Sequence, residues 1–278
     1  MKNTLFLALL FVVISLSAQT EKQIFGPRLT NTALYLDPTE LMVNGSLTAL
    51  PEKAIADYQY IPFAFGFSQS LWGKKLESGK AWEVFTELGT FTQFEWKIVD
   101  GEQQRNLINT DYKAAISYAR KVSAKFTYRL RFFHVSSHLG DDFIIRNGIR
   151  SYTENKVNYE QLEASVFYHY EENLRINAGV GSVVRPNAKR LPFSFHLGAD
   201  HNWKKNDKWG ISSGFLIKGK QEHAFQASGK VGVGPAFFSK HKAEPIRLLF
   251  EYYEGHLPYS QFEANETEWY GVGLYFYL

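Results

Sequence analysis

A stretch near the middle of the chain, Phe126 to Ser136, alternates strictly between apolar and polar side chains. The residues of one parity are apolar or aromatic, namely Phe126, Tyr128, Leu130 and Phe132. The residues of the other parity are polar, namely Thr127, Arg129 and Arg131. Because a strand places successive side chains on opposite faces, this stretch predicts a strand with one greasy face and one cationic face.

The same alternation recurs in eleven runs along the chain. They lie near 58–69, 82–97, 111–120, 125–136, 157–170, 174–185, 192–204, 208–218, 223–238, 246–254 and 267–278. The chain also begins with one lysine, an apolar run from Leu5 to Ile14 and a small-residue end at Ser17-Ala18, which is typical of a secretory signal peptide over 1–18. Together the two features predict an all-β fold, a transmembrane antiparallel up-and-down β-barrel in the outer membrane of a Gram-negative bacterium.

The composition agrees with this class. No later segment has the roughly 18 consecutive apolar residues of a spanning helix, yet the chain holds 23 Phe, 16 Tyr and 6 Trp. Half-apolar strands with aromatic girdles explain both facts. There is no cysteine, which excludes thiol chemistry and cysteine metal sites. The net charge of +3 is too small to indicate nucleic acid as a partner.

Short polar connections alternate with longer ones, predicted at 100–110, 137–156 and 255–266, as expected where turns face the periplasm and loops face outward. A barrel with both ends in the periplasm needs an even number of strands, so we infer a twelfth strand within 33–50. This gives a barrel of about 12 strands over 56–278. Residues 19–55 form an N-terminal periplasmic segment or the first strand, with a plug as a further possibility.

The last segment, Tyr270 to Leu278, is amphipathic. Barrels of this class usually end in such a strand, closed by an aromatic residue and recognised by the assembly machinery. Here Phe276 lies two residues before the terminal leucine. We therefore expect the barrel assembly machinery and outer-membrane lipids as partners.

His134 and Ser136 continue the greasy face of the central stretch. Ten residue steps of about 3.4 Å, tilted by about 40°, rise about 26 Å, the height of the lipid-facing band. This puts both side chains at the outer rim, beside the ester groups of lipids. Antiparallel pairing with 157–170 sets His134 near Glu160 and Ser136 near Asn158. A nucleophilic hydroxyl needs a base, and the base needs a third group to orient it. Ser136, His134 and one of Asn158, Glu160 or Asn147 fit those roles.

The motif His134-Val135-Ser136 resembles the His-x-Ser motif of outer-membrane phospholipase A, a twelve-stranded barrel whose lipid-facing triad is completed by an asparagine and assisted by calcium. It also resembles that of the barrel lipid A deacylase, whose third member is a glutamate. Asn147 lies eleven residues past Ser136, one short of the phospholipase spacing. These resemblances imply a serine hydrolase acting on lipid acyl esters.

A longer segment, Arg131–Phe143 (RFFHVSSHLGDDF), resembles the signature of the domain-of-unknown-function 1207 family of exported barrels. An Arg-Asn pair at 146–147 and an Asn-Tyr strand start at 158–159 add to it. The whole mature chain is compatible with this family, which implies an outer-membrane barrel and no established reaction.

Other polar residues leave two further interpretations open. Asp141 and Asp142 are oxygen donors suited to a cation such as calcium, or they form a plain Gly-Asp turn. The alternative for the rim residues is that they only mark where strands leave lipid, in a non-enzymatic structural or small-solute channel barrel. In the lumen, we expect Arg129 and Arg131 to pair with the carboxylates Glu83, Glu87 or Glu163.

Overall fold

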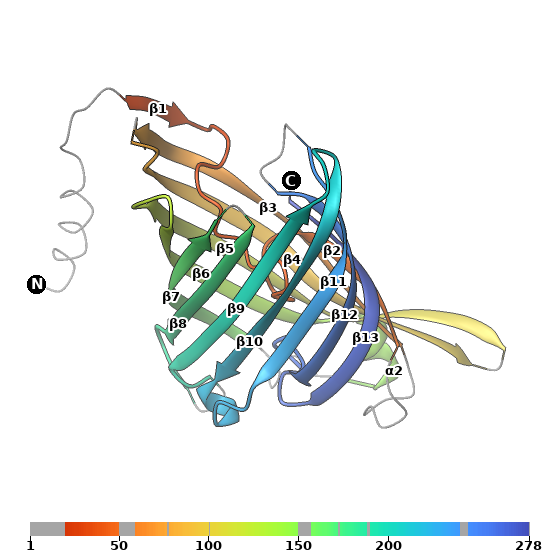
Figure 1. The fold of residues 1–278 in the computed structure, drawn as a ribbon. Helices are drawn as coiled ribbons and strands as arrows, with labels where there is room; N and C mark the ends of the chain where they lie inside the picture. Colours follow the sequence, from red (N-terminus) through yellow and green to blue (C-terminus); the bar gives the residue numbers. More distant parts are fainter. Residues whose placement is uncertain are drawn as a thin grey trace, which may run out of the picture.

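The computed structural model describes residues 20–49, 59–76, 78–99, 101–149, 157–171, 173–187, 190–239 and 244–277. The predicted signal peptide lies outside them. Twelve antiparallel strands, β2 to β13, close into a barrel, and a further short strand, β1, pairs with the end of β3 (Figure 1). The predicted fold class and strand number are confirmed. No helix in the described ranges has the length and apolar character that crossing a bilayer requires.

The elements are β1 Thr20–Ile24, β2 Val43–Ala49, β3 Gln59–Leu76, β4 Ala81–Val99, β5 Glu102–Lys121, β6 Phe126–Leu139, α2 Asp141–Arg146, β7 Val157–Tyr170, β8 Leu174–Val183, β9 Phe193–Lys204, β10 Trp209–Lys220, η2 Gln221–His223, β11 Ser228–Phe237, β12 Ile246–His256 and β13 Glu266–Phe276.

The barrel closes between its last strand and a strand that the alternation alone does not reveal. β13 pairs with β2 from Tyr270↔Ala49 to Phe276↔Val43, and β2 pairs with β3 at Asn44↔Ala64 and Gly45↔Phe63. β2 lies within 33–50, the range inferred for the twelfth strand. We name the two rims by the strands that their connections join: the turn end carries the β5–β6, β7–β8 and β9–β10 connections, and the loop end carries the β6–β7, β10–β11 and β12–β13 connections.

One predicted loop is wrong. Residues 102–110 belong to β5 and pair with β4, so the two strands form a long hairpin that projects past the loop end (Figure 1). The prediction fails because residues 102–106 are polar on both faces. A hairpin that extends beyond the barrel wall needs no apolar face, so its sequence lacks the alternation of a wall strand.

The wall shows the expected separation of faces. Outward side chains are apolar and exposed, for example Leu130 and Phe132 on β6, while Arg129 and Arg131, which have the opposite parity, are buried in the lumen at 1% exposure. A strand surrounded by lipid outside and packed polar groups inside produces this pattern.

The segment between β1 and β2 fills the lumen. We call Gly26–Met42 the plug segment. Leu34, Leu36 and Met42 are buried there against wall residues such as Phe167 and Leu249. A plug, one of the alternatives for the residues before the barrel, is thus the arrangement of the residues directly before β2 (Figure 1).

Candidate functional site

Strand β6 presents the predicted site residues on its outward face. His134 and Ser136 follow Phe132 at two-residue intervals, and the His134 side chain is 45% exposed. The neighbours of opposite parity, Phe133 and Val135, are buried in the lumen. The alternation that makes the strand therefore also places the imidazole and the hydroxyl on the lipid side, near the loop end.

The neighbouring strand brings the predicted partners opposite. The register between β6 and β7 pairs His134 with Glu160 and Ser136 with Asn158. The Nδ1 of His134 lies 3.0 Å from Oε1 of Glu160. Because a carboxylate accepts, this contact fixes Nδ1 as the protonated nitrogen of the neutral ring and leaves the lone pair on Nε2.

Ser136 has a different imidazole partner from the predicted one. Its Oγ lies 2.9 Å from Nε2 of His138, the next residue but one along the same face. The ring of His138 packs edge-on against Tyr112 of β5, with centroids 5.7 Å apart. The site thus consists of two pairs, His134 with Glu160 and Ser136 with His138.

Sequence alternation puts His138 in a loop and misses its role. Strand β6 continues to Leu139, three residues past the predicted end, so His138 shares the parity of Ser136. The signal is present in the alternation Ser136, His138. The signal is weak because Ser136, Ser137 and His138 are all polar, so the two faces of the strand do not differ in polarity here.

Asn147, the third-member alternative suggested by resemblance, lies at the C-terminal end of α2. Its Nδ2 donates to the carbonyl of Phe143 at 2.7 Å, so the side chain is engaged with its own helix. Asn158 is exposed directly across from Ser136. The register thus brings Asn158 and Glu160, but not Asn147, to the cluster on β6.

Asp141 and Asp142 form the first turn of α2. Oδ2 of Asp142 accepts from the backbone N–H of Leu107 at 3.0 Å, while Asp141 is exposed. Gly140 precedes them because a Cβ there would lie 2.2 Å from the Leu107 carbonyl oxygen. Calcium takes six to eight oxygen ligands. These two carboxylates, one of them engaged, supply only a small part of such a set.

A cluster at the loop end has closer metal-ligand spacing. Within the described part of the chain, Glu222, His223 and Glu263 place one ligand atom each within 4.8 Å of one another. However, Arg190 bonds both carboxylates, at 2.8 Å from Glu222 and 2.5 Å from Glu263, and Lys220 lies 2.5 Å from Glu263. The carboxylates are already neutralised, so this cluster is an ion-pair network that ties η2 to the β12–β13 loop.

The same network sets the ionisation of Glu263, which lies in the loop outside the strands. Burial by itself raises the pKa of this carboxyl, but the cations Lys220 and Arg190 outweigh burial and hold the pKa below its ordinary value. Glu263 therefore stays charged and keeps the loop in place at neutral pH.

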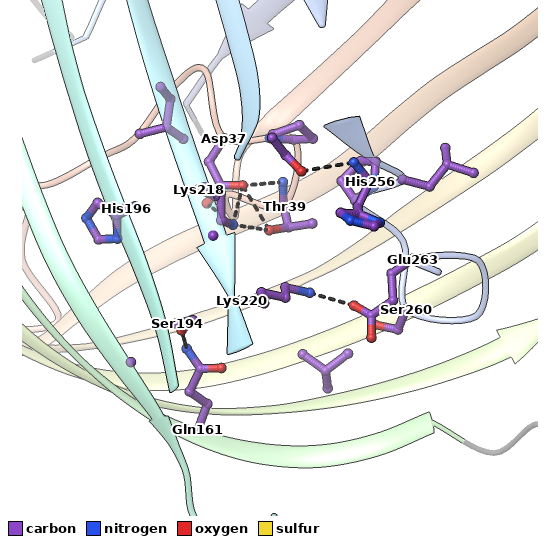
Figure 2. Close-up of a pocket in the computed structure, with 18 of the residues that line it drawn as sticks. Asp37, Thr39, Gln161, Ser194, His196, Lys218, Lys220, His256, Ser260 and Glu263 are labelled. Atoms are coloured by element: carbon purple, nitrogen blue, oxygen red, sulfur yellow. Dashed lines mark hydrogen bonds and ion pairs between the residues drawn. The ribbon is translucent and has the colours of Figure 1, made fainter. Parts of the chain in front are cut away.

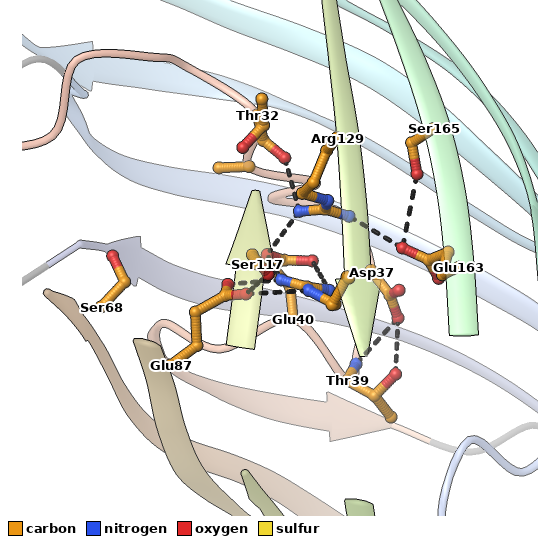
Figure 3. A network of polar contacts seen from close by, with 12 residues as sticks. Thr32, Asp37, Thr39, Glu40, Ser68, Glu87, Ser117, Arg129, Glu163 and Ser165 are labelled. Atoms are coloured by element: carbon orange, nitrogen blue, oxygen red, sulfur yellow. Dashed lines mark hydrogen bonds and ion pairs between the residues drawn. The ribbon is translucent and has the colours of Figure 1, made fainter. Parts of the chain in front are cut away.

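Inside the barrel, Arg129 and Arg131 of β6 join the plug segment to the wall. Figure 3 shows Arg129 together with Glu40 and Glu87. Arg131 bonds Glu87 of β4 at 2.5 Å and Glu40 of the plug segment at 2.8 Å. Arg129 bonds Glu163 of β7 at 3.0 Å and donates to the carbonyl of Thr32 at 2.7 Å. The expected pairing with Glu87 and Glu163 is present.

Glu83 pairs elsewhere, contrary to the expectation that it pairs with Arg129 or Arg131. It accepts from Nε of Arg28 at 3.0 Å and from the backbone N–H of Thr30 at 3.0 Å. The reason is that the plug segment passes beside β4 and supplies its own cation there. Sequence alternation describes the wall only and gives no position for a cation carried by the plug.

These features define a class: a twelve-stranded membrane-type β-barrel with a plugged lumen and a polar cluster on its lipid-facing surface. The family described as Protein of unknown function (DUF1207) matches residues 65–278, and the chain belongs to this family. No curated protein sequence matches the chain.

Solved structures of similar fold are outer-membrane proteins. Outer membrane phospholipase A from Escherichia coli aligns over 86% of this chain and 96% of its own, with 12% identity and a TM-score of 0.56. The Salmonella typhi outer membrane phospholipase dimer with bound calcium aligns over 91% of this chain and 98% of its own, with 12% identity and a TM-score of 0.57. At these identities the likeness is one of fold.

Proposed function

We propose that this chain is an outer-membrane protein of a Gram-negative bacterium that hydrolyses acyl esters of lipids from the outer surface of its barrel. Ser136 is the nucleophile, His134 the general base, and Glu160 the residue that orients His134. The observation that carries the proposal is that Ser136 lies between His134 and His138 on one strand face, with its hydroxyl bonded to His138 and with His134 bonded to a carboxylate.

The choice of base follows from the hydrogen bonds. An imidazole acts as base at the nitrogen that its orienting partner leaves unprotonated. Glu160 holds Nδ1 of His134, so Nε2 is the basic atom, and Ser136 is the next outward residue. The ring of His138 packs against an aromatic side chain instead. We therefore assign the Ser136–His138 bond to the resting state. Rotation of Ser136 about χ1 brings its hydroxyl toward His134, as catalytic hydrogen bonds often tighten only with substrate bound.

The reaction then has two steps. Oγ of Ser136 attacks the ester carbonyl carbon while Nε2 of His134 takes its proton, and the tetrahedral intermediate expels the lipid alcohol, to which His134 returns the proton. Water, deprotonated by His134, next cleaves the acyl-serine and releases the fatty acid. Asn158, directly opposite Ser136, is the side chain placed to donate an N–H to the developing oxyanion. No step passes through a cation.

Hydrolysis by the folded barrel tests this assignment. The purified protein is mixed with phospholipid or lipopolysaccharide in detergent micelles, and released fatty acid is measured. We expect S136A to lower the rate by at least about 10³-fold. The matched control is S182A, because Ser182 is an exposed serine on β8. Heat-modifiable mobility on a gel verifies folding of each variant.

A second candidate function rests on a different observation, the polar plug network in the lumen. A non-enzymatic barrel, structural or conducting small solutes, would release no fatty acid from either substrate. In that case S136A and S182A would both leave the lipid composition of the membrane unchanged, and the hydrolase assignment would be withdrawn.

A further inference from the structure

A chamber lies in the lumen between the plug segment and the loop end. Its floor is the turn Leu36–Thr39, its walls are the inner faces of β5, β7, β9 and β10, and the β12–β13 loop covers it from 257 to 263. Its volume of about 90 Å³ has room for roughly six to nine water molecules. A second cavity of about 370 Å³, lined by residues 26–33, lies on the other side of the plug segment. The plug segment therefore separates the chamber from that cavity.

Most charged side chains around the chamber are already engaged (Figure 2). Lys218 uses its donors on both oxygens of Asp37 and on Oγ1 of Thr39, and Lys220 bonds Glu263. Lys230 bonds Tyr275 and Glu251 inside the lumen. These groups hold the plug and the loop, and they leave few free donors toward the chamber.

Lys113 differs from the other lysines. Its Nζ donates to the carbonyl of Thr39 at 3.1 Å and lies 4.4 Å from the centroid of the Phe133 ring. Within the described residues no carboxylate lies within 4.0 Å of it. Because an ammonium has three donors, two N–H bonds of this buried group remain for another acceptor.

The nearest acid along the strand does not take up those donors. Asp111 lies two residues before Lys113 on the same face, but its oxygens accept from Asn109, Ser137 and the backbone N–H of Ser260. On β9, His196 is 5% exposed and its Nε2 has no hydrogen-bond partner in the described structure. Unmade hydrogen bonds on buried polar groups are unfavourable, so two such groups lining one cavity indicate a bound acceptor.

Part of the remaining wall is apolar, beside polar side chains such as Gln161, Ser194 and His256. Phe91, Val135, Tyr253 and Leu257 line the chamber together with the ring of Phe133. A pocket with an apolar body and a few convergent donors is typical of a site for a small organic ligand.

We propose that the chamber binds a small organic anion, with its carboxylate on Lys113 and His196 and its apolar part against the aromatic wall. The volume suits a ligand of roughly six to nine non-hydrogen atoms, by comparison with the water it displaces. This site is separate from the rim cluster on β6–β7, since its residues face the lumen and Ser136 faces lipid.

Calorimetry on the detergent-solubilised barrel tests the proposal, with benzoate as the probe and benzamide as its uncharged counterpart of the same shape. We expect benzoate to bind and benzamide to bind at least 10-fold more weakly. K113M should lower the affinity for benzoate about 10- to 100-fold, the loss expected for a hydrogen bond to a charged group. K204M is the matched control, because Lys204 is exposed at the turn end of β9.

H196F provides a second variant in case K113M does not fold, and it should also weaken benzoate binding. Equal affinities for benzoate and benzamide, or unchanged binding in every folded variant of the chamber, would overturn the proposal. S136A should leave benzoate binding intact, so the outcome is independent of the hydrolase assignment.

Discussion

Arg131 is the residue whose removal tests the plugged lumen most directly. It is 1% exposed, and it bonds the wall through Glu87 at 2.5 Å and the plug segment through Glu40 at 2.8 Å. Replacement by methionine keeps an unbranched stem of similar reach but leaves two buried carboxylates without this cation. Removing one partner of a buried ion pair costs about 3–5 kcal/mol, so R131M should lower the free energy of unfolding by that amount.

Urea unfolding of the barrel in lipid vesicles, followed by tryptophan fluorescence, measures this change. The matched control is R185M, since Arg185 is exposed beyond the end of β8 and its loss should change the free energy by no more than about 0.5 kcal/mol. A free energy for R131M within about 1 kcal/mol of wild type would refute the reasoning, because it would mean that the ion pairs contribute nothing to the folded state.

A double-mutant cycle with the same variant separates the contribution of the Arg131–Glu40 contact to the plug segment from that of the contacts to the wall. If Arg131 holds the plug segment through Glu40, E40Q should cost less in the R131M background than alone, with a coupling of about 0.5–3 kcal/mol. The double variant should also show more frequent conductance steps in a planar bilayer, because the plug segment is then less firmly held. Strict additivity together with an unchanged conductance would show that the plug is held by its other contacts.

Three further outcomes follow from the site, the loop and the wall. H134A should lower the rate of lipid hydrolysis by about 10²- to 10⁴-fold. H138A should retain hydrolysis, because the ring of His138 only holds the hydroxyl of Ser136 in the resting state. If the fatty-acid assay instead showed the larger loss in H138A, His138 would be the general base. Glu263 has a lowered pKa, so its stabilisation is complete above its ordinary pKa of 4.5 and is lost as the pH falls through the lower value of the folded state. Limited proteolysis should therefore cut the 257–265 loop faster in acid, and E263Q should be cut at neutral pH without that dependence; a cleavage rate independent of pH in the wild type would contradict this. L130R, near the middle of the lipid band, should destabilise by about 2–4 kcal/mol and F126R, near the turn end, by about 0–1 kcal/mol, and equal losses would show that the assumed membrane position is wrong.

Much of the wall could be predicted because lipid imposes one requirement on every strand. The apolar residues of β6 and β7 must lie on the same surface, and a one-residue slip would turn them all inward. This requirement excludes every odd shift of register, and simple antiparallel pairing of the two strands then sets His134 opposite Glu160. The same alternation gives the lumen position of Arg131.

The plug and the partner of Ser136 could not be predicted in this way. The plug segment has no period, and its contacts join residues far apart in the chain, as in the bond between Glu40 and Arg131, 91 positions apart. At the rim, both faces of a strand meet water and the alternation loses contrast. This explains why the alternation predicts an end of β6 before His138.

The short ladder between β2 and β3 gives the plug a mechanical link to the wall. The plug segment runs directly into β2 at Val43, and β2 joins β3 through only two residue pairs in the described range. A force that draws the plug out of the barrel is therefore transmitted along the backbone to the strand with the weakest lateral attachment. Extraction of the plug and opening of the seam beside it are consequently one mechanical event.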